Sequence, residues 1–305
     1  MNKLNWLMVV CTVLFLAGCS NLAAPTATLE ASATEAHPTQ IVVTPSRTST
    51  YTPEPTQTFT PLSSTWTPQP TLRADEAKKL LYELLKDNGG CKLPCFWGII
   101  PGKTTWQEAK SFLEVFSQKI SIRGDPEKLG SLDVLLPFPK EMGTTWHYYY
   151  IREGFVDEIS SYNDDLSPAF YLTKFLNAYG PPDEVWIRTQ AIEEQGSQPF
   201  EVALFYPDQG ILMDYSGGDL TTVGENLRNC LGDDLDSPFI ILWNVTEKTS
   251  FDQVIKPLLH GPYDDPFLPL EEAAGMDAKT FYESFRTPGN NACIVTPKNL
   301  WPGGQ

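Results

Sequence analysis

"LTKFLNAYGPPDEVWI", residues 172–187, joins a helical pattern to a strand through a Gly-Pro-Pro stop. Ser167-Pro168 is a typical helix start, because proline suits the first helical position. Apolar residues at helical spacing continue the pattern to about Ala178, and Gly180 with the two prolines ends it. The segment Glu184–Arg188 then has the alternation of a strand.

A second stretch, "FEVALFYPDQGILMDY" at residues 200–215, supplies two more strands. Phe200–Tyr206 and Ile211–Tyr215 are separated by Pro-Asp-Gln-Gly, whose residue types favour a turn. We therefore expect a helix followed by three antiparallel strands.

The same order of elements is predicted about 60 residues earlier. In "PGKTTWQEAKSFL", residues 101–113, Thr104 with Gln107 resembles a capping box that opens a helix to about Phe116. A series of strands follows this helix. Their expected ranges are Lys119–Arg123, Leu132–Leu136, and a hairpin of Thr145–Ile151 with Phe155–Ser161. The fold class is therefore predicted as α+β, with two helix-plus-antiparallel-sheet repeats.

These repeats resemble those of β-lactamase-inhibitor-like proteins and of small outer-membrane assembly lipoproteins. The likeness covers residues 98–218 and depends on spacing more than on residue identities. It implies a protein that binds other proteins and is not an enzyme. We place the repeat domain at residues 74–218, beginning with an amphipathic helix Ala74–Lys86.

Residues 219–305 are expected to form a C-terminal extension packed on the repeats. Its predicted elements are a strand at Phe239–Trp243, a helix from Ser250 to about Leu259, and a short helix beginning near Asp277.

The N-terminus resembles the signal of bacterial lipoproteins. Lys3 precedes an apolar run that is too short to span a bilayer, and the run ends in Leu-Ala-Gly-Cys19, which resembles a lipobox. The resemblance implies that residues 1–18 are a signal peptide and that Cys19 carries a diacylglyceryl group and fatty acids such as palmitate. The protein would then be exported and anchored to the outer face of the cell membrane, or to an outer membrane where one exists.

A disordered tether is predicted to follow the anchor over residues 19–73. Thr, Pro and Ser make up 28 of the 54 positions from 20 to 73, and these residue types build no core. We expect this linker to hold the folded part away from the membrane.

The cysteines beyond the signal and the lipid site are Cys91, Cys95, Cys230 and Cys293. An even number of exported thiols is most simply two disulfides, and we favour Cys91–Cys95 and Cys230–Cys293 over the other connectivities. The alternative is a copper or redox pair at Cys91 and Cys95, as in copper-delivering proteins of the thioredoxin fold, with His147 or His260 as a further ligand. No thioredoxin-like pattern surrounds these cysteines.

Composition narrows the possible functions. The formal net charge of −16 disfavours nucleic acid as a partner. We find no nucleophile, zinc or phosphate-loop motif, so we expect no catalytic residues, cofactor or metal. The main hypothesis is a non-enzymatic binding or assembly module of the bacterial cell envelope, with another envelope protein as its partner. The alternative is an envelope hydrolase that uses paired carboxylates.

Alternation along the strands suggests where a partner binds. Residues Phe200, Val202, Leu204 and Tyr206 share one face, expected beneath the helices, and Glu201, Ala203 and Phe205 share the other. In Thr145–Ile151, Trp146, Tyr148 and Tyr150 alternate with His147, Tyr149 and Ile151, so both faces are rich in rings. We take Tyr149 and Phe205 as the candidate binding residues on an open face of the sheet.

Overall fold

The computed structural model of the protein describes residues 72–137, 143–162, 168–190, 200–231, 238–246, 249–255, 266–290 and 292–303. These residues belong to one compact unit. The expected signal peptide, Cys19, His260 and nearly all of the expected tether lie outside the described residues.

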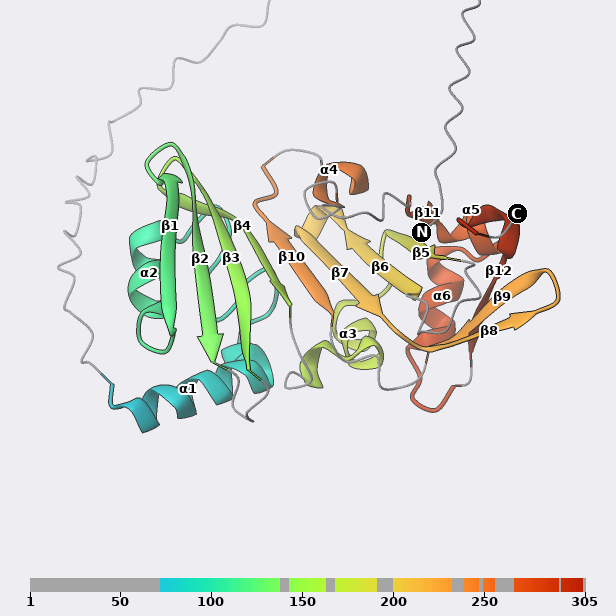
Figure 1. The fold of residues 1–305 in the computed structure, drawn as a ribbon, viewed down its shortest axis with the longest axis horizontal. Coiled ribbons are helices and arrows are strands. Elements are labelled where there is room, and N and C mark those ends of the chain that lie inside the picture. Colours follow the sequence, from blue (N-terminus) through green and yellow to red (C-terminus); the bar gives the residue numbers. More distant parts are fainter. Residues whose placement is uncertain are drawn as a thin grey trace, which may run out of the picture. The chain divides into compact units, whose positions relative to one another are not determined.

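Within these ranges, nine strands form one antiparallel sheet, which confirms the α+β class (Figure 1). The order across the sheet is β1-β2-β3-β4-β10-β7-β6-β5-β11, so each predicted repeat contributes a meander of neighbouring strands. The bounds are β1 Lys119–Asp125, β2 Leu129–Pro137, β3 Thr144–Arg152, β4 Phe155–Tyr162, β5 Glu184–Thr189, β6 Phe200–Tyr206, β7 Ile211–Ser216, β10 Phe239–Trp243 and β11 Leu268–Pro269.

The C-terminal segment, expected to pack on the repeats, also contributes a strand to the large sheet. Its strand β10 lies between β4 and β7 and pairs antiparallel with both. The two meanders are therefore joined by a strand that follows both of them in the sequence, because β4 and β7 are not themselves neighbours.

A second sheet contains β8 (Asp219–Val223), β9 (Asn226–Cys230) and β12 (Cys293–Pro297), none of which the sequence analysis predicted. Cys230 and Cys293 are directly opposite each other in the β9–β12 pair and form a disulfide. Cys91 and Cys95 form the other disulfide. The favoured connectivity is confirmed.

The helices are α1 Ala74–Asp87, α2 Trp106–Leu113, α3 Leu172–Tyr179, α4 Phe251–Ile255, α5 Leu270–Ala274 and α6 Ala278–Phe285. Short 3₁₀ turns lie at Asn88–Gly90, Pro168–Phe170, Pro207–Gln209 and Lys298–Leu300. The capping box of α2 uses Thr105 and Glu108, one residue later than predicted. The Thr104 hydroxyl instead accepts a hydrogen bond from the Ile100 N–H. None of the described helices is long and apolar enough to cross a membrane.

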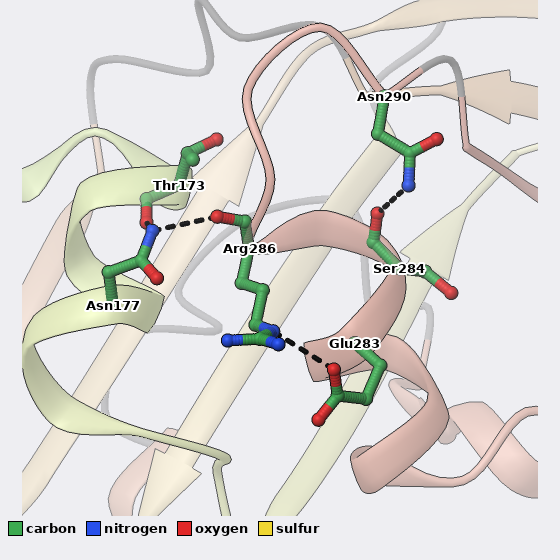
Figure 2. Close-up of polar contacts among 6 residues, drawn as sticks. All are labelled: Thr173, Asn177, Glu283, Ser284, Arg286 and Asn290. Carbon is green, nitrogen blue, oxygen red and sulfur yellow. Dashed lines mark hydrogen bonds and ion pairs between the residues drawn. The ribbon is translucent and has the colours of Figure 1, made fainter.

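Side-chain contacts attach the C-terminal helix α6 to α3, the helix of the second repeat (Figure 2). The Asn177 amide donates to the Thr173 carbonyl, 2.8 Å away, and to the Arg286 carbonyl, 2.7 Å away. Arg286 also pairs with Glu283, and the Asn290 amide donates to the Ser284 carbonyl. The Asn177 and Asn290 amides thus satisfy the Arg286 and Ser284 carbonyls at the end of α6, where carbonyls lack partners within the helix.

The large sheet has a core on each face. One core holds the inner residues of β2–β4, β6, β7 and β10 together with apolar residues of α1, α2, α3, α5 and α6. Residues Phe200, Val202, Leu204 and Tyr206 belong to it, as predicted. The other core is smaller and joins Phe205 and Trp243 of the sheet to α4.

Candidate functional site: an aromatic face and its adjoining pocket

Strand β3 presents one set of rings to each face of the sheet. His147, Tyr149 and Ile151 are buried, whereas Trp146 and Tyr148 are half-buried and Tyr150 is 40% exposed. The rings of Trp146 and Tyr148 stack with centroids 6.3 Å apart and planes 16° from parallel. The strand therefore carries an accessible aromatic row, Trp146-Tyr148-Tyr150, which we call the aromatic face.

The prediction that Tyr149 and Phe205 form an open face was wrong. Tyr149 is 0% exposed and Phe205 is 1% exposed. The strand register also places Tyr149 and Phe205 on opposite faces of the sheet. The residue before Tyr149, Tyr148, shares the face of Phe205, because the paired positions from β3 to β6 run through Ser160, Ile241 and Leu212. Tyr149 therefore points to the other face.

Different elements bury the two side chains. Tyr149 belongs to the core that contains α1 and α2, and this burial raises the pKa of its hydroxyl. Phe205 is covered by α4, because its ring stacks on Trp243 at 5.6 Å and meets Phe251 edge-on at 5.8 Å. The face that includes Phe205 is thus closed over the second repeat and accessible at Tyr148 and Tyr150 in the first.

Polar residues of neighbouring strands lie beside the aromatic face. Tyr148 lies between Asp133 and Ser160, and Tyr150 lies between Ser131 and Glu158. The buried Asp133 carboxylate is paired with exposed Arg123 of the edge strand β1. A surface that combines large rings with paired charges is typical of protein-binding sites.

A bulge places two consecutive carboxylates in one pocket beside this face. The register of β3 and β4 shifts between Tyr150 and Ile151, so Asp157 is an extra residue on β4. Strict alternation would put Asp157 and Glu158 on opposite faces, but a bulge re-aims side chains and both residues line the same pocket. The pocket has a volume of about 440 Å³ and lies between the β3–β4 turn, the end of β10 and α4.

The two carboxylates differ in their electrostatics. Asp157 forms an ion pair with Arg152, with the Nε and Oδ2 atoms 2.9 Å apart. Burial, together with the charge of Asp157, raises the pKa of Glu158 to about 7, and Arg152 opposes this rise. Near neutral pH Glu158 is therefore poised between its two protonation states, beside the ion pair of Asp157 and Arg152.

The sequence did not predict Asp157, Glu158 or the pocket as a site. Its only relevant signal was the hydrolase alternative, which required two convergent carboxylates without naming them. A bulge leaves no signature in this stretch of sequence, so the convergence became visible only in the register of the strands.

The cysteine pair at residues 91 and 95 staples a loop onto α1. The Asn88 amide donates to the carbonyls of Cys91 and Cys95, at 2.6 Å and 2.8 Å, and its oxygen accepts from the Trp97 N–H at 2.9 Å. The rings of Phe96 and Trp97 stack on each other, with centroids 4.8 Å apart. The loop is held by its own hydrogen bonds as well as by the disulfide.

His147 lies beside this loop but is packed as an aromatic ring. Its centroid is 4.9 Å from that of Trp97 and 5.7 Å from that of Phe96. Neither nitrogen has a hydrogen-bond partner among the described residues, and burial lowers the pKa of His147 to about 3. The described residues contain no group of three or more His, Cys, Asp or Glu arranged to hold a metal.

The chain has no match to any known family, to any curated protein or to any solved structure.

Proposed function

We propose that the protein is a lipid-anchored, extracytoplasmic binding module of the bacterial cell envelope that captures another envelope protein through its aromatic face. The observation that carries this proposal is the accessible row of Trp146, Tyr148 and Tyr150 along one strand of the sheet. Tyr and Trp offer a large contact area with few rotatable bonds, which suits them to anchor an interface.

The anchoring part of the proposal is supported by the Leu-Ala-Gly-Cys19 sequence after a short apolar run. Two disulfides in the folded part are consistent with an oxidising compartment outside the cytoplasm. The variant Cys19→Ala should leave an unprocessed precursor and incorporate no labelled fatty acid. Equal labelling of the wild type and this variant would contradict lipid attachment at Cys19.

The geometry of the pocket supports binding more than hydrolysis. A hydrolase with paired carboxylates needs both groups available to substrate and water. Here the Asp157 carboxylate forms an ion pair with Arg152. Of the two pocket carboxylates, only Glu158 has no ion-pair partner among the described residues.

Site-specific photo-crosslinking in cells tests the binding function. A photoreactive phenylalanine analogue at position 150 should give a discrete adduct whose second component is identified by mass spectrometry as an envelope protein. The matched control is position 82 on α1, because Tyr82 is 42% exposed and Tyr150 is 40% exposed. The adduct should disappear when Trp146→Ser is combined with the position-150 probe.

Two results would refute the aromatic face as the binding site. One is equal adduct formation from positions 150 and 82, which would indicate random collisions. The other is an adduct at position 150 that persists unchanged with Trp146→Ser.

A further inference from the structure

The pocket beside the aromatic face is lined by both carboxylates and apolar side chains. Asp157 and Glu158 supply the carboxylates, and Phe155, Trp243 and Val254 supply apolar surface. Phe155 is 43% exposed, so its ring is accessible from solvent. The pocket is continuous with the aromatic face, because Tyr150 and Trp243 are the direct strand partners of Glu158 on its two sides.

The charges that line the pocket do not cancel. Arg152 is paired with Asp157, and no other Lys, Arg or His is among the described residues that line the pocket. Glu158 and Glu153 line the same pocket and form no ion pair with any residue in the described part of the chain. A ligand group of positive charge would compensate the carboxylate that the fold leaves partly desolvated.

We propose that this pocket binds an organic cation, the ammonium or guanidinium end of an unbranched chain. The cationic head would meet the Glu158 carboxylate, and its methylene stem would pack against Phe155 and Val254. Rings such as Phe155 and Trp243 also favour a cation near their faces. A divalent metal is the poorer occupant, since the described residues provide no cluster of three metal ligands at any place.

The site has a built-in pH dependence. Glu158 has a pKa of about 7, and the titratable groups facing it are Asp157 on its own strand and Arg152 and Tyr150 on β3. The described pocket residues of β10 and α4 add no charge to it. If only the ionised form binds a cation, the dissociation constant should be about tenfold larger at pH 6 than at pH 8.

The source of the cation is either a basic side chain of the docked protein or a free amine. The first source rests on the proposed function, because a partner lying on the aromatic face would reach the pocket past Tyr150. The chemistry of the pocket is the same in both cases.

Binding of small probes to the purified protein tests the chemistry directly. The probes are N-acetyl-lysine methylamide and cadaverine, and the matched neutral probe is N-acetyl-norleucine methylamide. We expect the two amines to perturb the ¹⁵N-indole signal of Trp243 and to lower the pKa of Glu158, measured by carboxyl ¹³C titration. The norleucine probe should do neither.

Variants assign the effect to Glu158. Glu158→Gln should weaken lysine-probe binding at pH 8 at least tenfold and abolish its pH dependence. Asp157→Asn should weaken binding as well, and it serves as the second variant if Glu158→Gln perturbs folding. Glu114→Gln, an equal change of charge at the C-cap of α2, is the control and should bind like the wild type. Unchanged binding in Glu158→Gln, or equal binding of the norleucine probe, would overturn the proposal.

The crosslinking assay separates the two sources and the two proposals. If Glu158→Gln reduces the adduct from position 150, the cation is a side chain of the partner. If the amines bind and that adduct is unaffected, the cation is a free amine. If the amines bind and no specific adduct forms at all, the proposed function fails while the cation site stands.

Discussion

The buried His147 should make the stability of the protein depend on pH, and this dependence can be worked out from its environment. Its imidazole lies among Phe96 and Trp97, and burial lowers its pKa to about 3. In the unfolded chain a histidine has a pKa of about 6.5. The unfolded state therefore takes up a proton below about pH 6.5, whereas the native state does not until about pH 3.

The sign and size of the effect follow from this difference. The stability linked to His147 is complete above pH 6.5 and is lost as the pH falls from 6.5 toward 3. The loss should reach about 2 kcal/mol at pH 5 and about 3 kcal/mol at pH 4. We propose His147→Leu as the perturbation, because leucine keeps an apolar side chain of similar size and cannot titrate.

Urea unfolding followed by tryptophan fluorescence at a series of pH values from 8 to 4.5 measures this linkage, with both disulfides kept intact. The difference in unfolding free energy between the wild type and His147→Leu should change by about 2 kcal/mol between pH 8 and pH 5. The wild type should lose unfolding free energy relative to His147→Leu as the pH falls. Parallel stability curves for the two proteins over this range would refute the assignment of a neutral, buried imidazole.

Five other variants have expected outcomes in the same unfolding assay. Glu158→Gln should stabilise the protein by about 1–3 kcal/mol at pH 8 and by little at pH 4. The reason is that a carboxyl group whose pKa is raised in the folded state destabilises the protein as the pH rises from about 4.5 through 7. A variant less stable than the wild type at pH 8 would contradict this. Phe251→Ala should lower the unfolding free energy by about 3–5 kcal/mol, because the Phe251 ring lies in the core between α4 and the sheet and stacks on Trp186 at 4.4 Å. Tyr150→Ser should lower it by less than about 1 kcal/mol, because Tyr150 is exposed. Equal losses for the two variants would be inconsistent with an open aromatic face. Replacing Cys230 and Cys293 by Ser should lower the unfolding free energy by about 4 kcal/mol, because the disulfide closes a loop of 63 positions. Replacing Cys91 and Cys95 should lower it by about 2 kcal/mol, because that loop spans only 4 positions. The reverse ranking would show that loop entropy does not determine how much each disulfide stabilises the protein.

Local sequence signals predicted the elements of both repeats. The Gly-Pro-Pro stop after α3 and the alternation of β6 gave boundaries within a few residues of those observed. The small sheet was missed because Asp219–Val223 and Asn226–Cys230 are short and polar, so their strand character depends on pairing with each other and with β12. Such pairing is a tertiary property that a local pattern does not contain.

The candidate site was less predictable than the fold. Both sets of alternate residues in β3 are aromatic, so their chemistry alone does not tell which set faces the helices. In β6 the rule that a mixed set faces solvent failed, because α4 covers Phe205 and buries it beside Trp243. The pocket arises from a register shift at Tyr150 and Ile151. Because of this shift, Asp157 does not follow the strict alternation of side chains that a sequence pattern assumes.

The position of β10 sets the order in which the sheet can be completed when the chain emerges with its N-terminus first. β4 ends at Tyr162, but the strand that pairs with its free edge begins only at Phe239. A chain that emerges in this direction would hold β1–β4 with an unpaired edge while the whole second repeat emerges, and unpaired edges recruit other strands. Completion of the sheet is therefore a long-range step that must wait for the C-terminal segment, and a chain truncated before Phe239 would keep β4 and β7 as open edges prone to aggregation.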